Sequence, residues 1–171
     1  MRVLFYYRGS EHIGVESIIA YLKSKGHTVE LIYEPALGDN GYIDIPWLNK
    51  FFYNDKLIID KAKRFKPDLI AFSAITNLYL PITKLARKFK KVLPEVPIII
   101  GGIHPTSLPD DVIKEDCYDM LCLGEGEGAM EDLLDRMKNK LPYTDIKNLW
   151  VRDATGKIHK NQKRPVIRPL D

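Results

Sequence analysis

Four short segments of the sequence carry the residue types that most often bind ligands. They are Arg8–Gly14, Ser73–Asn77, Gly101–Thr106 and Gly124–Gly128. All four offer hydroxyl, carboxyl or imidazole groups, and three contain glycine, which lets a bulky ligand approach the backbone closely. Free N–H groups at helix N-termini can bond amide or phosphate oxygens nearby. Gathered at one edge of a sheet, the four segments would form one wide pocket suited to a large flat ligand.

The motifs of other nucleotide-binding and hydrolytic sites are absent or weak. Gly124–Gly128 lacks the spacing and the later acidic partner of a dinucleotide fingerprint, and no Walker-type phosphate loop occurs. A hydrolase elbow of the form Gly-x-Ser-x-Gly is also missing. Repulsion between Glu125 and Glu127 could raise one pKa, but two carboxylates at a helix N-terminus are more simply explained as partners of the helix dipole. Glycine after a strand is, taken singly, often only turn chemistry.

The histidines do not indicate a metal site. His12 and His104 have no metal-binding neighbour at a known spacing. We expect His27 and His159 to lie at the surface. No residue is therefore assigned as a metal ligand or as a catalytic group.

Composition indicates a globular chain without nucleic-acid or membrane partners. Its 171 residues are 45% hydrophobic and 29% charged, with a net charge of only +3. No apolar run approaches the ~20 residues that cross a bilayer, and the start is too short for a signal peptide. We expect a cytoplasmic protein, and two cysteines, Cys117 and Cys122, agree with a reducing setting but cannot hold zinc or an iron–sulfur cluster.

Short apolar runs alternate with helical periodicity. Val15, Ile18, Ile19 and Leu22, for example, follow the spacing of a core-facing helix. Such alternation predicts an α/β fold with a doubly wound, five-stranded parallel sheet in the flavodoxin-like order. Ligands then bind beyond the carboxyl ends of the strands, between the first and third. The strands are expected at Val3–Tyr7, Thr28–Tyr33, Leu69–Ser73, Pro97–Ile100 and Met120–Leu123.

The character of the chain changes after about Lys140. We therefore assign 1–140 to the ligand-binding domain and 141–171 to an extension and linker. Leu141–Arg152 contains one more candidate strand, and Asp153–Gly156 resembles a hairpin turn.

Together, the four loops resemble the N-terminal cobalamin-binding domain of cobalamin-dependent radical S-adenosylmethionine enzymes. The most specific parts are Gly101-Gly102-Ile103-His104-Pro105-Thr106 and Gly124-Glu125-Gly126-Glu127. Asn148–Arg152 and the tail up to Asp171 are similar to the segment that joins this domain to a catalytic barrel.

The resemblance implies that the nucleotide tail of cobalamin threads between the first and third strands. Two further loops would meet the tail, the corrin edge or the corrin amides. The residues implied as cofactor-binding are Gly9, Ser10, Glu11, His12, Ile13, Gly14, Ser73, Ala74, Ile75, Thr76, Gly101, Gly102, Ile103, His104, Gly124, Glu125, Gly126 and Glu127.

One departure from related domains concerns the cobalt. The methionine-synthase type carries Asp-x-His-x-x-Gly after its first strand, and that histidine ligates cobalt. Here the corresponding triplet is Gly9, Glu11 and Gly14, with histidine displaced by one residue to His12. One residue rotates a helical side chain by about 100°, so we expect base-off cobalamin without a histidine–cobalt bond.

A second departure concerns the catalytic barrel. The Cys-x-x-x-Cys-x-x-Cys motif of the family is absent, so S-adenosylmethionine and a [4Fe–4S] cluster would bind only in a missing C-terminal barrel. We expect a truncated piece or an isolated domain. Alone it would be a binding module, while the full-length protein would resemble a methyltransferase-type enzyme.

One alternative stays open from the sequence. A non-enzymatic flavodoxin-like sensor or interaction domain could bind another nucleotide cofactor, such as a flavin. Ser73, at the end of the third predicted strand, argues against a phosphoacceptor receiver domain, which needs an aspartate there.

Overall fold

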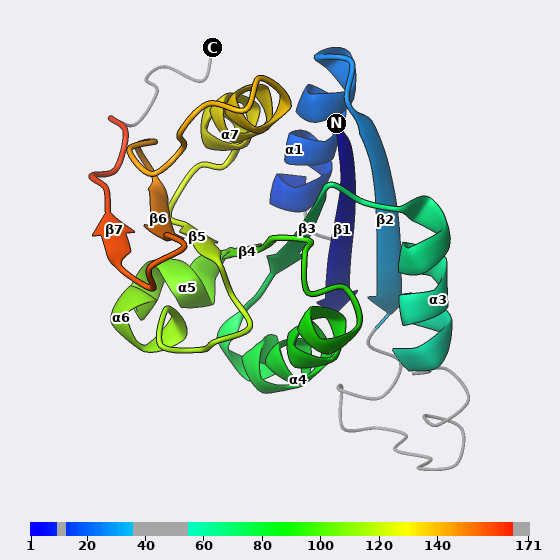
Figure 1. Ribbon diagram of the computed structural model, residues 1–171. Helices are drawn as coiled ribbons and strands as arrows, with labels where there is room; N and C mark the ends of the chain where they lie inside the picture. Colours follow the sequence, from blue (N-terminus) through cyan, green and yellow to red (C-terminus); the bar gives the residue numbers. More distant parts are fainter. Residues whose placement is uncertain (10–12, 36–54, 166–171) are drawn as a thin grey trace.

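The computed structural model describes residues 1–9, 13–35 and 55–165 (Figure 1). Ser10, Glu11 and His12 therefore lie outside the described residues. The strands are β1 (Arg2–Gly9), β2 (Thr28–Pro35), β3 (Leu69–Ser73), β4 (Ile98–Gly101), β5 (Met120–Cys122), β6 (Leu149–Arg152) and β7 (Ile158–Lys160). The helices are α1 (Ile13–Ser24), α3 (Asp55–Phe65), α4 (Tyr79–Val92), α5 (Ile103–Ser107), α6 (Pro109–Val112) and α7 (Glu127–Lys138), with a 3₁₀ turn at Thr76–Leu78.

Within these described residues the strands form one sheet in the order β2-β1-β3-β4-β5-β6-β7. The first five are parallel, which confirms the doubly wound α/β prediction with its flavodoxin-like order. The sheet is larger than the predicted five strands, because β6 and β7 add to β5 as an antiparallel hairpin. The turn predicted at Asp153–Gly156 joins these two strands.

Helices cover both faces of the sheet, and two hydrophobic cores result. Alternate residues of β1 point to opposite faces, as in any strand. Phe5 belongs to the core under α1 and α7, while Tyr6 belongs to the core under α3 and α4. Figure 1 shows α1 and α7 side by side on one face and α4 on the other. The central strands β3, β4 and β5 are covered on both faces and are almost entirely apolar.

The basic segment around Lys84 is the solvated side of α4, whereas Leu85 and Phe89 are turned into the core. The prediction that His27 lies at the surface is wrong, because this side chain is buried after the turn that ends α1. Among the described residues, no helix has the length and apolar character needed to cross a membrane.

One buried hydrogen bond joins α4 to the segment before β5. The hydroxyl groups of Thr83 and Tyr118 lie 3.0 Å apart, and Tyr118 is fully buried. Replacing Tyr118 with Phe should lower the free energy of unfolding by about 1 kcal/mol, because one buried hydrogen bond of the Thr83 hydroxyl is lost. Chemical denaturation of Tyr118→Phe, Thr83→Val and the double variant measures this cost. The double variant should be less destabilised than the sum of the two single changes, and strict additivity would contradict a direct bond.

Candidate functional site

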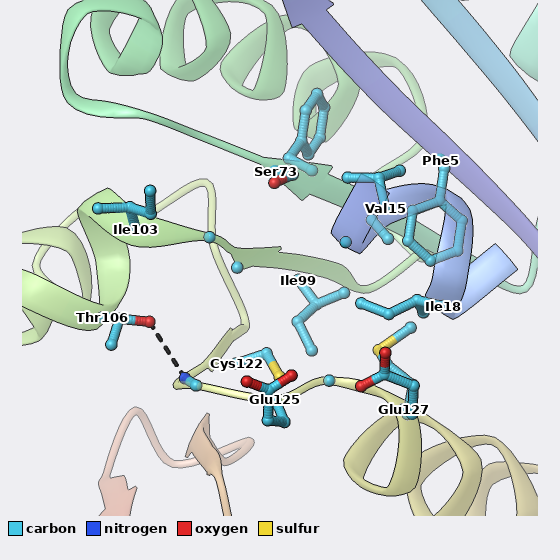
Figure 2. Close-up of a pocket in the computed structure, with 18 of the residues that line it drawn as sticks. Phe5, Val15, Ile18, Ser73, Ile99, Ile103, Thr106, Cys122, Glu125 and Glu127 are labelled. Carbon is cyan, nitrogen blue, oxygen red and sulfur yellow. Dashed lines mark hydrogen bonds between the residues drawn. The ribbon is translucent and has the colours of Figure 1, made fainter. Parts of the chain in front are cut away.

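A cavity of about 380 Å³ opens at the carboxyl ends of the parallel strands, between the sheet, α1 and the start of α7 (Figure 2). It lies where open α/β sheets bind their ligands. Its lining comes from four neighbouring strands, from the loops that follow them and from α1, α5 and α7. The lining residues are Phe5, Gly14, Val15, Ile18, Ala71, Phe72, Ser73, Ile99, Gly101, Gly102, Ile103, Thr106, Ser107, Cys122, Gly124, Glu125, Gly126, Glu127 and Met130.

Small side chains on adjacent strands make room for the cavity. Ala71 pairs with Ile99 across β3 and β4, and Cys122 ends β5 on the same face of the sheet. Burial raises the pKa of the Cys122 thiol to about 12, so this side chain remains a neutral, apolar group at physiological pH. The inner part of the cavity is therefore apolar.

Gly102 lets the exit of β4 pack against the exit of β3. Its backbone has φ +102° and ψ −172°, a region that is essentially restricted to glycine. A Cβ atom there would lie 2.7 Å from the carbonyl oxygen of Ala74 and 3.0 Å from Oγ of Ser73. The Ala74 N–H donates to the carbonyl of Gly101 at 3.0 Å. The two exits thus form one rigid wall of the cavity.

Two close contacts fix the position of the loop that follows β5. The Gly124 N–H donates to Oγ1 of Thr106 at 3.1 Å, which ties this loop to α5 (Figure 2). Gly126 faces α1, and a Cβ atom there would lie 2.7 Å from Cδ1 of Ile18. This close approach brings α1 and α7 together at the side of the cavity.

The two glutamates of this loop have different settings. Glu127 lies in the first turn of α7, where the helix dipole favours a carboxylate, and accepts a hydrogen bond from Oγ of Ser17 at 2.9 Å. Glu125 is exposed, and its backbone carbonyl accepts a hydrogen bond from Nδ2 of Asn148 at 2.8 Å. No feature of either glutamate indicates acid–base chemistry.

The cavity collects part of the residue set predicted from the sequence. The predicted residues that line it are Gly14, Ser73, Gly101, Gly102, Ile103, Gly124, Glu125, Gly126 and Glu127. The described predicted residues outside its lining are Gly9, Ile13, Ala74, Ile75, Thr76 and His104.

His104 faces the opposite side of the β4 exit from the cavity. Its ring is buried and stacks on Tyr79, with ring centroids 4.1 Å apart. Its Nδ1 lies 3.3 Å from Oγ1 of Thr76. Burial lowers the pKa of His104, which favours the neutral imidazole. In this structure the residue packs α5 against the start of α4.

Sequence reasoning missed most of the apolar lining. Phe5, Val15, Ile18, Ala71 and Ile99 were assigned to strands or to a core-facing helix and not to a site. A signal existed in the small residues near the ends of the strands, including Cys122. The cavity also extends across β4 and β5, beyond the slot expected between the first and third strands.

The family model described as "B12 binding domain" matches residues 9–134, which include every residue that lines the cavity except Phe5. The chain belongs to the B12-binding domain family. Cobalamin is vitamin B12, so the family agrees with the cofactor inferred from the four loops.

Two curated relatives and one solved structure extend the comparison. The chain is 26% identical to the anaerobic magnesium-protoporphyrin IX monomethyl ester cyclase of Rubrivivax gelatinosus, over 100% of this chain and 31% of that protein. It is 28% identical to an uncharacterized methyltransferase of Pyrococcus horikoshii, over 64% of this chain and 24% of that protein. The cobalamin-dependent S-adenosylmethionine radical enzyme OxsB, solved with aqua-cobalamin and S-adenosylmethionine bound, superposes with a TM-score of 0.73 at 17% identity.

The OxsB superposition covers 96% of this chain and 22% of that protein, and it establishes a shared fold. The chain spans less than a third of the length of each of these three proteins.

Gly102→Ala tests the geometry of the wall. We expect it to lower the free energy of unfolding by about 3 kcal/mol, because it adds a clash with Ala74 to an unfavourable backbone conformation. Gly156→Ala is the matched control: it has φ +84° in the β6–β7 turn, with no atom near the added Cβ, and should cost about 1 kcal/mol. Thermal and denaturant unfolding compare the two. Equal losses would contradict the close contact between the two exits.

Proposed function

We propose that this chain binds cobalamin with the nucleotide tail in the cavity and the corrin ring over its mouth. The single observation that carries the proposal is an apolar hollow, edged by glycine-rich loops, at the strand ends of a B12-binding domain. The cofactor-binding loops are those predicted from the sequence: residues 9–14, 73–76, 101–104 and 124–127.

The size and lining of the cavity fit the tail rather than the whole cofactor. A volume of about 380 Å³ is near the lower end of the range for ligand pockets. It suits an aromatic base with part of its sugar, whereas the corrin ring must remain outside. The base would contact Ile99, Cys122 and Met130, which form apolar surface. Toward the mouth, the hydroxyl groups of Ser73 and Thr106 can bond polar groups of the tail.

The binding mode that we propose is base-off, without a histidine ligand to cobalt. Support comes from the sequence, where histidine is displaced by one position relative to the cobalt-ligating motif of the methionine-synthase type. The cavity adds support, because a tail held inside the protein has its base detached from cobalt. His104, the other histidine of the four loops, stacks on Tyr79 away from the cavity.

We further propose that the chain is the cofactor module of a longer radical S-adenosylmethionine enzyme of the methyltransferase type. The named relatives support this, and the short share of each that the chain spans leaves room for a catalytic domain. S-adenosylmethionine and the [4Fe–4S] cluster would belong to that domain. Cobalamin, when bound, supplies methyl transfer or tunes radical chemistry. The residues of this chain would bind and orient it and keep water from its tail.

A titration with hydroxocobalamin tests the proposal directly. We expect the wild type to bind hydroxocobalamin saturably, as measured by visible absorption and calorimetry. Gly101→Leu should bind at least about tenfold more weakly. A Cβ atom at Gly101 would meet only Cys122, at 3.5 Å, so the leucine would extend into the cavity. Ala20→Leu, on the exposed side of α1, adds comparable bulk elsewhere and should bind normally. Equal binding by both variants would contradict a tail in the cavity, and binding of a flavin in place of cobalamin would favour the alternative cofactor.

His12→Ala tests the cobalt ligation. We expect a base-off spectrum for the wild type with hydroxocobalamin, and the same spectrum and affinity for the variant, because no bond to cobalt is lost. A spectrum that changes on substitution of His12 would show that this histidine ligates the metal.

A further inference from the structure

A second feature of the fold connects the cavity to residues 161–165, here called the strap. The strap follows β7, and the segment that leads into β6 lies between it and the β5 exit loop. Asn148, just before β6, contacts both segments. This asparagine is buried, with 3% of its surface exposed, and has φ +73°, a conformation that asparagine tolerates better than most residues.

All four polar groups of Asn148 are used. On the side of the cavity, its Nδ2 donates to the Glu125 carbonyl at 2.8 Å, and its own carbonyl accepts from the Leu123 N–H at 2.8 Å. On the side of the strap, its Oδ1 accepts from the Arg164 N–H at 2.5 Å, and its N–H donates to the Gln162 carbonyl at 3.0 Å. One buried residue therefore forms the hydrogen-bonded link between the two segments.

The strap is also held against α7. The Arg164 guanidinium pairs with Asp132 and lies over the first turn of this helix. A Cβ atom at Gly128 would lie 2.5 Å from Nη1 of Arg164, so a glycine in this turn makes the approach possible. The cavity loop, the start of α7 and the strap consequently form one packed unit.

We propose that Asn148 is a positioning residue that makes the Leu123–Gly126 loop and the strap become ordered together, so that cobalamin binding fixes the course of the strap. This inference rests on the proposed function, because cobalamin is the ligand that would hold the loop. By thermodynamic linkage, whatever stabilises the loop stabilises the strap, and the reverse also holds. Through this link, an occupied cavity would hold the strap in place.

Two substitutions of Asn148 separate its side-chain contact with the loop from its side-chain contact with the strap. Asn148→Asp keeps the acceptor for the Arg164 N–H but replaces the donor to the Glu125 carbonyl with an oxygen, so only the side-chain bond to the loop is lost. Asn148→Gly permits the positive φ and removes both side-chain bonds. Asn161→Ala is the control: Asn161 donates from Nδ2 to the carbonyls of Thr144 and Leu149, so its loss loosens the strap without changing Asn148.

Amide hydrogen exchange of the full chain without cobalamin tests the link itself. We expect exchange in the Leu123–Gly126 loop to accelerate about three- to tenfold in both Asn148 variants, as for the loss of one buried hydrogen bond. The Arg164 amide should accelerate in Asn148→Gly but not in Asn148→Asp. Unchanged loop exchange in both variants, or uniform acceleration across the chain, would overturn the inference.

Repeating the exchange with saturating hydroxocobalamin tests the coupling. Wild type and Asn161→Ala should gain protection at the Arg164 amide on binding, whereas Asn148→Asp should bind several-fold more weakly and gain none. Equal protection of the strap in Asn148→Asp would overturn the coupling. If the wild type binds no hydroxocobalamin while the cobalamin-free pattern is as expected, the proposed function fails and the link between loop and strap stands.

Discussion

The contact between the exits of β3 and β4 sets the shape of the site. Gly102, in the exit of β4, makes this contact possible because it has no side chain. A Cβ atom at this position would collide with the carbonyl oxygen of Ala74, in the exit of β3. The joined exits line the cavity together with residues of α1. The hollow beneath α1 then remains because Ala71 and Cys122, on the same face of the sheet, are small.

Three further connections join other elements around the cavity. Thr106 connects α5 to the β5 exit, Ser17 connects α1 to α7, and Asn148 connects the β5 exit to the strap. Each of these connections is a side-chain hydrogen bond between segments distant in the sequence. Binding geometry is thereby built into the scaffold before a ligand arrives, and such preorganisation reduces the entropy lost on binding.

Periodicity and strand-end chemistry predicted the fold class, the order of the five parallel strands and the edge of the sheet at which the cavity opens. Gly102 and Ser73 were identified because polar and glycine residues after a buried strand stand out. Ala71 and Ile99 could not be identified in this way, since an apolar strand residue looks the same whether it packs against a helix or borders a hollow. The role of His104 depends on its contact with Tyr79, which only the folded arrangement reveals. Strands β6 and β7 were recognised only as a candidate strand and turn, because each strand is short and incompletely buried.

The most direct test of the central claim compares cobalamin with cobinamide, which has the corrin ring but lacks the nucleotide tail. If the tail occupies the cavity beneath α1, burial of its aromatic base should make cobalamin bind at least about a hundredfold more tightly. Calorimetry or equilibrium dialysis with both corrinoids measures the ratio. Equal affinities would show that the cavity does not hold the tail and would contradict the binding mode proposed for this domain.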